Sequence, residues 1–405
     1  MKRIIDAARS LAQTRGSFYL YDEDSVFRHI RLLKTAFPLA QFLYSVKCNS
    51  NPHVIRSVCS QGLGADAASL SEVMAARDAG LRRDQIYYSA PGKTPDHIRQ
   101  AILKSILIAD STGELLQIQA AAEEAGETVC AGIRINPDFS FGGGPGVPSK
   151  FGIDEDQAYR FLAEHPLKNV RICGIHVHLK SQELRSDVLA EYYRNMFRLA
   201  ETFERTTGFS LKFLNLGSGI GIPYSPDDRP LDLEALGKTA ADLFSGFRAS
   251  HPDTKLLIET GRFAVGKSGF YITRVLDRKV SRGKTYLILE NTMNGFFRPV
   301  LANLICRYSS DPSPEGCEPL FTCRDECEII PLKEEGPSER VTLAGNLCTA
   351  ADVIAEDILL PHLEPGDLIA VTNAGSYASV LTPFQFSSQQ KPEEFFLTAD
   401  GKILS

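Results

Sequence analysis

The chain has 405 residues, of which 43% are hydrophobic and 23% are charged, and its 44 Lys and Arg against 50 Asp and Glu give a formal net charge of -6. This length exceeds one ordinary hydrophobic core and this composition excludes a disordered chain, so we expect two compact domains or one large barrel with an appended domain. A slightly acidic chain without a clustered basic face argues against nucleic-acid binding.

The hydropathy of the chain, its N-terminal segment and its cysteines indicate where the protein resides and whether it has disulfides or a metal site. No uninterrupted apolar run approaches the roughly 18 residues that span a bilayer, and Asp6 and Arg9 interrupt any apolar signal segment. We therefore expect a cytoplasmic protein with no membrane partner. Nine cysteines, an odd number, argue against a disulfide scaffold. Cys317, Cys323 and Cys327 come closest to a metal cluster, but their spacing is irregular and no His is near them in sequence, so no metal site is predicted.

From about residue 41 to 260, short apolar runs alternate with amphipathic stretches of helical period, which is the pattern of βα units. The expected strands are 41–46, 64–67, 86–89, 106–109, 129–135, 172–178, 213–216 and 256–259, with helix-like segments at 53–61, 71–79, 112–125, 187–206 and 233–250. Eight such repeats are the content of a (β/α)8 barrel. The alternative is a doubly wound sheet, but no Gly-rich dinucleotide turn follows the first strand.

After residue 262 the pattern changes. GFYITRVLDRK and KTYLILE alternate like half-buried antiparallel strands, helical period returns only over 350–360, and GDLIAVTNAGSY reads as a strand ending in a turn. The run SFYLYDED near residue 20 is a candidate strand of the same domain. We therefore expect an α/β protein with a (β/α)8 TIM barrel over residues 27–262 and a mainly antiparallel β domain made of residues 1–26 and 263–405.

Polar side chains at the ends of barrel strands are the first candidates for chemistry, because barrel active sites lie where strands end. The first strand ends at Lys47, in FLYSVKCNSN. An isolated lysine is ordinarily a surface residue. A lysine that is desolvated at a barrel mouth instead has a lowered pKa, and it can attack a carbonyl to form a Schiff base.

The sixth strand ends in His176 and His178, which strand alternation places on the same side. Three interpretations remain open for them: a metal pair, a buried structural histidine, or a ring in an active site. No third ligand of defined spacing accompanies the pair.

The last two strands end in a possible phosphate site and a possible ion pair. Gly217, Ser218 and Gly219 follow the seventh strand, at the place where such barrels commonly bind phosphate. The eighth strand ends in Glu259, with Arg262 one tight turn later, and a structural ion pair is the ordinary interpretation. Together these features supply what pyridoxal 5'-phosphate requires: a Schiff-base lysine, a phosphate-binding loop, a carboxylate for the pyridinium nitrogen and a stacking ring.

With these residues in place, the chain resembles the diaminopimelate/ornithine decarboxylase family of pyridoxal-phosphate enzymes. The resemblance covers nearly the whole chain, and its motifs occur in family order: YSVKCN, GADAASLSE, APGKT, SKFG, HVHLKSQ, NLGSGIG, ETGR, GNLCTAAD and NAGSY. The family's fold is an alanine-racemase-like barrel followed by a C-terminal β domain, which is the division already expected from the periodicity.

The resemblance implies a role for each matched residue. Lys47 would bind the cofactor covalently, and His178 would stack on its ring. Further cofactor contacts would come from Asp66, Arg134, Ser181, Gly217, Ser218, Gly219, Glu259, Gly261, Arg262 and Tyr377. Glu259 would keep the ring nitrogen protonated, which favours decarboxylation, whereas racemases of this fold place an Arg there. Cys348 matches a catalytic cysteine that the family inserts from the partner subunit, which implies a homodimer with shared active sites.

Departures from the family pattern bear on the substrate. Diaminopimelate and ornithine enzymes carry Glu or Asp immediately after the cysteine to engage a distal amine, but this chain has Thr349, which cannot offset the cost of burying an ammonium group. Ala302 also stands where the diaminopimelate pattern has Tyr. Arg298 could grip a distal carboxylate with two hydrogen bonds. Lys180 replaces a glycine of the family, and it either adds a cation near the site or faces solvent.

We therefore expect decarboxylation of an amino acid, or of an amino-acid conjugate, that has an anionic distal part and no free distal amine, with Tyr377 as a further substrate contact. This pattern resembles the branch of the family that acts on conjugated amino acids in siderophore and aminoglycoside biosynthesis. Diaminopimelate decarboxylation in lysine biosynthesis is the alternative. A racemase and a non-catalytic regulatory homologue are less favoured, because the cofactor residues are all present.

Overall fold

The computed structural model describes the whole chain except residues 218, 312–317, 324–325 and 334–335. It divides into two compact units. One, the barrel unit, comprises His29–Ile222 and Pro230–Gly261. The other, the sheet unit, comprises Met1–Arg28, Pro223–Arg229 and Arg262–Ser405.

The barrel unit is a closed ring of parallel strands. Its strands are β2 (Ala40–Ser45), β3 (Gly64–Ala67), β4 (Ile86–Tyr88), β5 (Ile106–Ala109), β6 (Val129–Asn136), β8 (Val170–His176), β9 (Phe213–Asn215) and β10 (Lys255–Thr260), with the short β7 (Ile153–Asp154) beside β6. They follow the order β5-β4-β3-β2-β10-β9-β8-β6, and β6 pairs with β5 to close the ring. The sequence-based expectation of a (β/α)8 barrel is confirmed.

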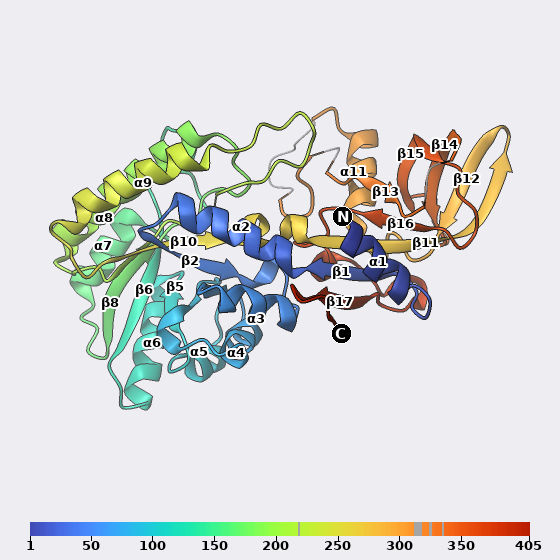
Figure 1. Ribbon diagram of the computed structural model, residues 1–405. Coiled ribbons are helices and arrows are strands. Elements are labelled where there is room, and N and C mark those ends of the chain that lie inside the picture. Colours follow the sequence, from blue (N-terminus) through green and yellow to red (C-terminus); the bar gives the residue numbers. More distant parts are fainter. Residues whose placement is uncertain (218, 312–317, 324–325, 334–335) are drawn as a thin grey trace. The chain divides into compact units, whose positions relative to one another are not determined.

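Helices alternate with the strands along the chain and lie outside the barrel (Figure 1). They are α2 (Glu23–Ala36), α3 (Pro52–Ser60), α4 (Leu70–Asp78), α5 (Pro95–Ala101), α6 (Thr112–Glu124), α7 (Glu155–Glu164), α8 (Ser186–Thr207) and α9 (Leu233–Arg248). Polar caps fix where several begin: Ser69 accepts a hydrogen bond from the Glu72 amide, and Ser111 accepts one from the Glu114 amide. Because these caps follow their strands closely, the loops from β3 to α4 and from β5 to α6 are short.

The barrel interior is filled by side chains. Leu43, Tyr87, Ile108, Phe213 and Leu257 form a buried cluster contributed by strands from around the ring. The rings of Tyr87 and Phe213 meet edge to face with centroids 5.1 Å apart. Since this core closes the middle of the barrel, chemistry is confined to the ends of the strands.

The sheet unit holds a second, mixed sheet. Its elements are α1 (Lys2–Leu11), β1 (Phe18–Asp22), α10 (Arg262–Val265), β11 (Gly269–Ser281), β12 (Lys284–Leu289), α11 (Phe297–Tyr308), β13 (Ile329–Pro331), β14 (Ser338–Gly345), β15 (Val353–Pro361), β16 (Leu368–Val371), β17 (Glu393–Leu397) and β18 (Ile403–Leu404). Most neighbouring strands are antiparallel, whereas β1 and β17, and β12 and β14, are parallel pairs. The expected N-terminal strand is confirmed, because β1 lies between β11 and β17.

Two expectations for this unit are wrong. Residues 350–360 were expected to be helical, but β15 covers most of them, pairing with β14 through register shifts. The irregular pairing, with Asp357 at a φ of 53°, breaks the two-residue alternation that would have identified a strand. The helix α11 was not expected at all. Its buried face is short, Arg298, Pro299, Val300 and Ala302, so helical period is weak over this segment.

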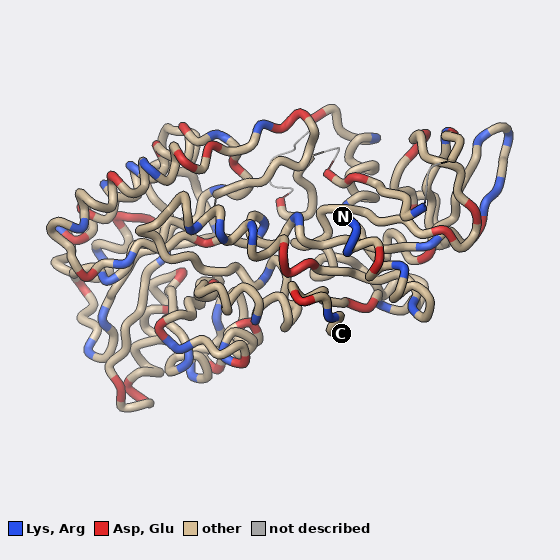
Figure 2. The backbone as a smooth tube through the Cα atoms, in the orientation of Figure 1, with Lys and Arg blue, Asp and Glu red and all other residues tan. Residues whose placement is uncertain are grey.

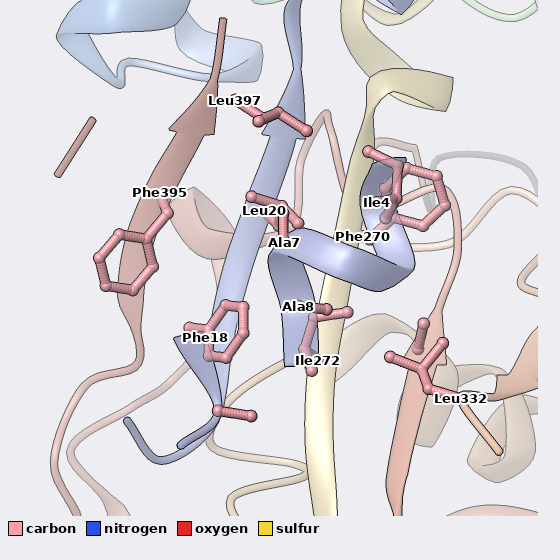
Figure 3. Packing of buried hydrophobic residues seen from close by; sticks show 12 residues of the cluster. Ile4, Ala7, Ala8, Phe18, Leu20, Phe270, Ile272, Leu332, Phe395 and Leu397 are labelled. Carbon is pink, nitrogen blue, oxygen red and sulfur yellow. The ribbon is translucent and has the colours of Figure 1, made fainter. Parts of the chain in front are cut away.

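Packing across the sheet unit explains why the N-terminal segment belongs to it. Ile4, Ala7 and Ala8 of α1 belong to one buried cluster with Phe18 and Leu20 of β1, and Figure 3 shows Ala7 near Leu20 and Ile4 beside Phe270. The same cluster includes Phe270, Ile272, Leu332, Phe395 and Leu397. Burying a side chain of this size contributes about 1.5–3 kcal/mol, so segments far apart in sequence stabilise one core.

Charges of both signs alternate along α8 and α9 (Figure 2). They pair along each helix, as Arg194 does with Glu191 at 3.0 Å and Lys238 with Asp242 at 2.7 Å. Such exposed pairs contribute little to stability. None of the described helices combines the length and apolarity needed to cross a membrane.

Candidate active site

Lys47 and Asp66 form the first charged pair at the barrel mouth. Lys47 lies in a single turn of 3₁₀ helix, Val46–Cys48, directly after β2. Its Nζ is 3.1 Å from Oδ2 of Asp66, whose other oxygen accepts a hydrogen bond of 2.5 Å from Ser89 Oγ. Asp66 is fully buried, whereas the Lys47 side chain is 42% exposed. The pair therefore holds an accessible amine in a defined orientation.

Glu259 is the most strongly anchored carboxylate of the site. It lies near the end of β10 with its side chain 2% exposed, and its Oε1 is 3.1 Å from His176 Nε2 and accepts a 3.0 Å hydrogen bond from Asn215 Nδ2. Burial by itself disfavours ionisation of Glu259. The interaction with His176 and the charge of Lys47 outweigh burial and hold the pKa of Glu259 well below its ordinary value. The site thus contains a fixed anion.

His178 presents a neutral ring. It lies two residues beyond the end of β8, it is half-buried, and its Nε2 is 3.3 Å from Ser181 Oγ. Burial lowers the pKa of His178 to about 3, since the opposing effect of Glu259 is smaller and the cations Lys47 and Arg134 lower it further. An uncharged imidazole at neutral pH is suited to stacking on a flat ligand.

Arg134 is oriented by three neighbours. Its Nη1 lies 3.6 Å from Asp110 Oδ1, its Nη2 donates to the main-chain oxygen of His178 at 3.4 Å, and its guanidinium covers the Phe151 ring at 4.4 Å. The side chain is almost fully buried. Arg134 therefore fixes the backbone that carries His178.

The glycine loop after β9 requires glycine at its first position. Gly217 has a φ of +65°, and a Cβ there would lie 2.3 Å from the carbonyl oxygen of Val177. Its amide donates to Asn215 Oδ1 at 2.9 Å. Gly219 has a φ of +149°. Ser218, which was expected to contact phosphate, lies outside the described residues.

Gly261 and Lys180 are two further predicted site residues of the barrel unit; the first is tightly packed and the second is exposed. A Cβ on Gly261 would lie 3.1 Å from Cys48 Sγ, so the chain is tightly packed where β10 ends. Lys180 is 53% exposed, with its Nζ 2.9 Å from Glu183 Oε2 and 5.7 Å from the Phe141 ring centre. Of the two interpretations for Lys180, the structure favours the exposed one, with its charge paired.

In the sheet unit, Arg262 and Tyr377 contact each other. The Arg262 guanidinium lies 5.2 Å from the Tyr377 ring centre, and it also forms an ion pair with Glu318. Tyr377 has a φ of 51°, which is unusual for a residue with a side chain and is associated with functional turns. The turn packs closely enough that a Cβ on Gly375 would lie 1.8 Å from Val265 O.

The contacts of Arg298 differ from those that the sequence predicts. Its side chain is 1% exposed, its Nη2 forms an ion pair with Glu326 and donates to Thr322 Oγ1 at 3.0 Å, and its Nη1 donates to Ser376 O at 3.2 Å. The sequence suggested a free guanidinium for a substrate carboxylate. The carboxylate that contacts Arg298 in the structure is the chain's own Glu326.

Cys348 and Thr349 lie in the loop between β14 and β15. Cys348 is exposed and Thr349 half-buried. Asp352 holds the loop, accepting hydrogen bonds from the Leu347 amide at 3.0 Å and from Thr292 Oγ1 at 2.5 Å. The loop therefore displays Cys348 on the surface of this chain.

Sequence reasoning missed the partners of these residues. Asn215 links Glu259 to the glycine loop, and Ser89 fixes Asp66. Both stand at or directly after a barrel strand, so their position was an available signal. His176 was recognised, and among its three open interpretations the structure favours a buried histidine that pairs with an acid. No group of three or more His, Cys, Asp or Glu side chains in the described part of the chain is arranged to hold a metal ion.

The side chains fit pyridoxal phosphate by the chemistry of their donors. Lys47 supplies an accessible amine, His178 a neutral ring, and Glu259 an anion of the kind that pairs with a pyridinium N–H. Gly217 lets the loop turn tightly against Val177 and His178, and backbone turns of this kind can form anion-binding concavities.

Comparisons with known proteins agree with this chemistry. Residues 23–266 match the family model described as pyridoxal-dependent decarboxylase, pyridoxal binding domain. The chain is 33% identical to L-glutamyl-(BtrI acyl-carrier protein) decarboxylase of Niallia circulans, over 96% of this chain and 91% of that protein. It is 29% identical to diaminopimelate decarboxylase of Aquifex aeolicus, over 92% of this chain and 85% of that protein.

Among solved structures, diaminopimelate decarboxylase from Helicobacter pylori, complexed with L-lysine, is similar with a TM-score of 0.82 and 28% identity. The match covers 98% of this chain and 95% of that one. The similarity therefore extends over both units of the chain.

Proposed function

The chain belongs to the pyridoxal-dependent family of ornithine, diaminopimelate and arginine decarboxylases, and we propose that within it the enzyme decarboxylates a conjugated amino acid with no free distal amine. The observation that carries the reaction type is the buried, ionised Glu259 between His176 and Asn215. The proposal for the substrate depends on Thr349 and on the relative from Niallia circulans.

The residues of the barrel unit would each have a defined task. When bound, pyridoxal phosphate supplies an electron sink for the charge left at the α-carbon as carbon dioxide departs. Glu259 would hold a proton on the ring nitrogen, because its own pKa is too low for it to take that proton. Lys47, oriented by Asp66, would hold the cofactor and later help release the product amine. His178, being neutral, would cover one face of the ring.

The remaining predicted contacts would hold the phosphate. The Gly217 amide already donates to Asn215, so we expect the amides of Gly219 and Gly261 and the Ser181 hydroxyl to face the phosphate, with Gly217 shaping the loop.

The acid at this position favours decarboxylation over racemisation. An anion paired with the ring nitrogen keeps the cofactor protonated and a strong sink, so loss of the carboxylate is favoured over reversible proton transfer. A racemase of this fold would place a cation there. Cys348 would donate a proton to the α-carbon in the active site of a second copy of the chain, as the family resemblance implies for a homodimer.

The substrate is proposed to lack a distal ammonium group. Thr349 offers no charge to compensate one, and burying an unpaired ammonium costs several kcal/mol or more. The relative from Niallia circulans is named for a glutamyl group carried on an acyl-carrier protein. We propose a conjugate of this kind, in which the distal end is covalently bound. The expected distal anion depends on Arg298, and the Glu326 ion pair removes the direct support for it.

Diaminopimelate decarboxylation is the second candidate. It is supported by the relative from Aquifex aeolicus and by the solved structure from Helicobacter pylori. The two functions differ in the distal end of the substrate, which is a neutral ester or amide in one and a zwitterion in the other.

A substrate panel distinguishes them. Purified holoenzyme is incubated with meso-diaminopimelate, ornithine, lysine, glutamate and the γ-thioester of glutamate with N-acetylcysteamine, and carbon dioxide release is measured. We expect the thioester to have the highest kcat/KM. Efficient turnover of meso-diaminopimelate, with none of the thioester, would overturn the substrate proposal in favour of the second candidate.

A further inference from the structure

A buried charge network in the sheet unit joins Arg298 to a segment that the family motifs do not include. Glu326 pairs with Arg298, and the two side chains are only 4% and 1% exposed. The Tyr224 ring lies against the same guanidinium, 5.5 Å from its carbon to the ring centre. Arg298 is therefore enclosed on several sides by its own chain.

The same segment neutralises a second arginine. Glu318 pairs with Arg262, and Thr322, which accepts a hydrogen bond from Arg298, donates to Glu318 Oε1 at 2.5 Å. Thr322 thus links the two ion pairs. Glu318 and Glu326 thus bring two carboxylates to two arginines whose positions match cofactor and substrate residues of the family.

The charges within this network balance. In the part of the chain that the structure describes, the two guanidinium groups face two carboxylates at contact distance. A third carboxylate brought to Arg298 would be buried without a free cation, and an uncompensated buried anion is costly. A neutral carbonyl adds no charge and can still accept a hydrogen bond from the guanidinium.

We propose that Glu326 determines substrate preference by occupying Arg298, so that the enzyme discriminates against amino acids with a free distal carboxylate and accepts those whose distal end is a neutral ester, thioester or amide. This inference rests on the proposed function, because it takes Arg298 as the residue that meets the distal end of the substrate. Glu326 acts through Arg298 and is a positioning residue.

The test compares two ligands that differ only at the distal end, L-glutamate and its γ-thioester with N-acetylcysteamine. For each, the dissociation constant is obtained from the change in the cofactor absorbance of the holoenzyme, and kcat/KM from carbon dioxide release. The wild-type enzyme is expected to bind the thioester at least about 10-fold more tightly, since burying the uncompensated distal carboxylate of glutamate costs at least this order. Equal or tighter binding of glutamate by the wild-type enzyme would overturn the inference.

The variant Glu326→Gln keeps the size and a hydrogen bond but removes the anion. We expect its preference to shift toward glutamate by roughly 10- to 100-fold in both measurements, because Arg298 then meets the distal carboxylate directly. In the double variant R298Q/E326Q this shift should disappear. An unchanged preference in a folded Glu326→Gln enzyme would overturn the inference.

A matched control is Glu356→Gln, which breaks the exposed ion pair with Arg307 in the same unit and should leave the preference unchanged. Failure of the proposed function is recognised separately. If the ligands bind with the expected preference but neither releases carbon dioxide, the decarboxylase substrate proposal fails while the role of Glu326 stands.

Discussion

At the scale of single residues, Glu259 and its two neighbours carry most of the chemistry. His176 and Asn215 stand on adjacent strands of the barrel, and both reach the same carboxylate oxygen. Local pattern identified Glu259 as a candidate, but the stabilisation of its charge depends on partners from β8 and β9. Sequence spacing alone did not reveal that arrangement.

The variant Glu259→Gln tests this residue directly. It retains the shape and the contact with His176 but loses the negative charge, so we expect kcat to fall by about 100-fold or more, as when one preorganised electrostatic contact is removed. Cofactor binding, measured by absorbance, should weaken less than kcat. A Gln variant with the wild-type rate would show that the charge at this position is not required.

The low pKa of His178 predicts how the stability of the folded chain depends on pH. The folded pKa of about 3 lies below the value near 6.5 of the unfolded chain, so the unfolded state binds more protons between these values. The stabilising contribution is complete above about pH 6.5 and is lost as the pH falls toward 3. We expect the urea midpoint of the apoenzyme to decrease between pH 7 and pH 5, and the decrease to be smaller in His178→Phe.

The control for this effect is His165→Phe, at an exposed histidine on the outside of the barrel unit. It should retain the wild-type difference between the two pH values. If His178→Phe and the wild type lose equal stability on acidification, then His178 is not the group responsible.

At the scale of elements, the barrel strands were predictable because each is a short apolar run separated by an amphipathic helix. The bounds of β3 and β5 agree with the expectation to the residue. The exceptions lie in the sheet unit. Tertiary pairing with β14 makes β15 a strand despite its helix-like spacing, since strand formation depends strongly on neighbours.

The glycine loop after β9 provides a prediction at this scale. Gly217 and Gly126 have nearly equal φ values, +65° and +67°, but only at Gly217 would a Cβ meet another atom, at 2.3 Å. Gly126→Ala should therefore cost only the left-handed strain, about 1–2 kcal/mol. Gly217→Ala should lower the melting temperature further and weaken cofactor binding about 10-fold or more. Equal effects of the two variants would contradict a special role for this loop.

The ion pair of Arg298 with Glu326 shows the limit of motif reading at this scale. The motif identified Arg298, but its partner lies in a segment with no family pattern, and only the folded chain brings the two together. A residue can therefore match a family motif while its charge is paired with another residue of the same chain.

At the scale of the whole molecule, the proposed homodimer with shared active sites predicts complementation. Lys47→Ala and Cys348→Ala are each expected to be inactive. When the two variants are unfolded together and refolded as a mixture, half of the dimers should combine both chains, and one of their two sites would be intact. Activity should then return to about a quarter of the wild-type value. Mixtures that stay inactive, although mixed dimers form, would mean that each site is built from one chain.

In the proposed reaction of the whole enzyme, the α-carboxylate of a conjugated amino acid leaves as carbon dioxide. The most direct test supplies the holoenzyme with the glutamate γ-thioester labelled with ¹³C in its α-carboxylate, and follows the label by mass spectrometry. We predict that the label appears in carbon dioxide in a 1:1 ratio with the amine product, and that Lys47→Ala releases none. Label retained in an amino acid of inverted configuration, or no release while labelled meso-diaminopimelate is decarboxylated, would contradict the account.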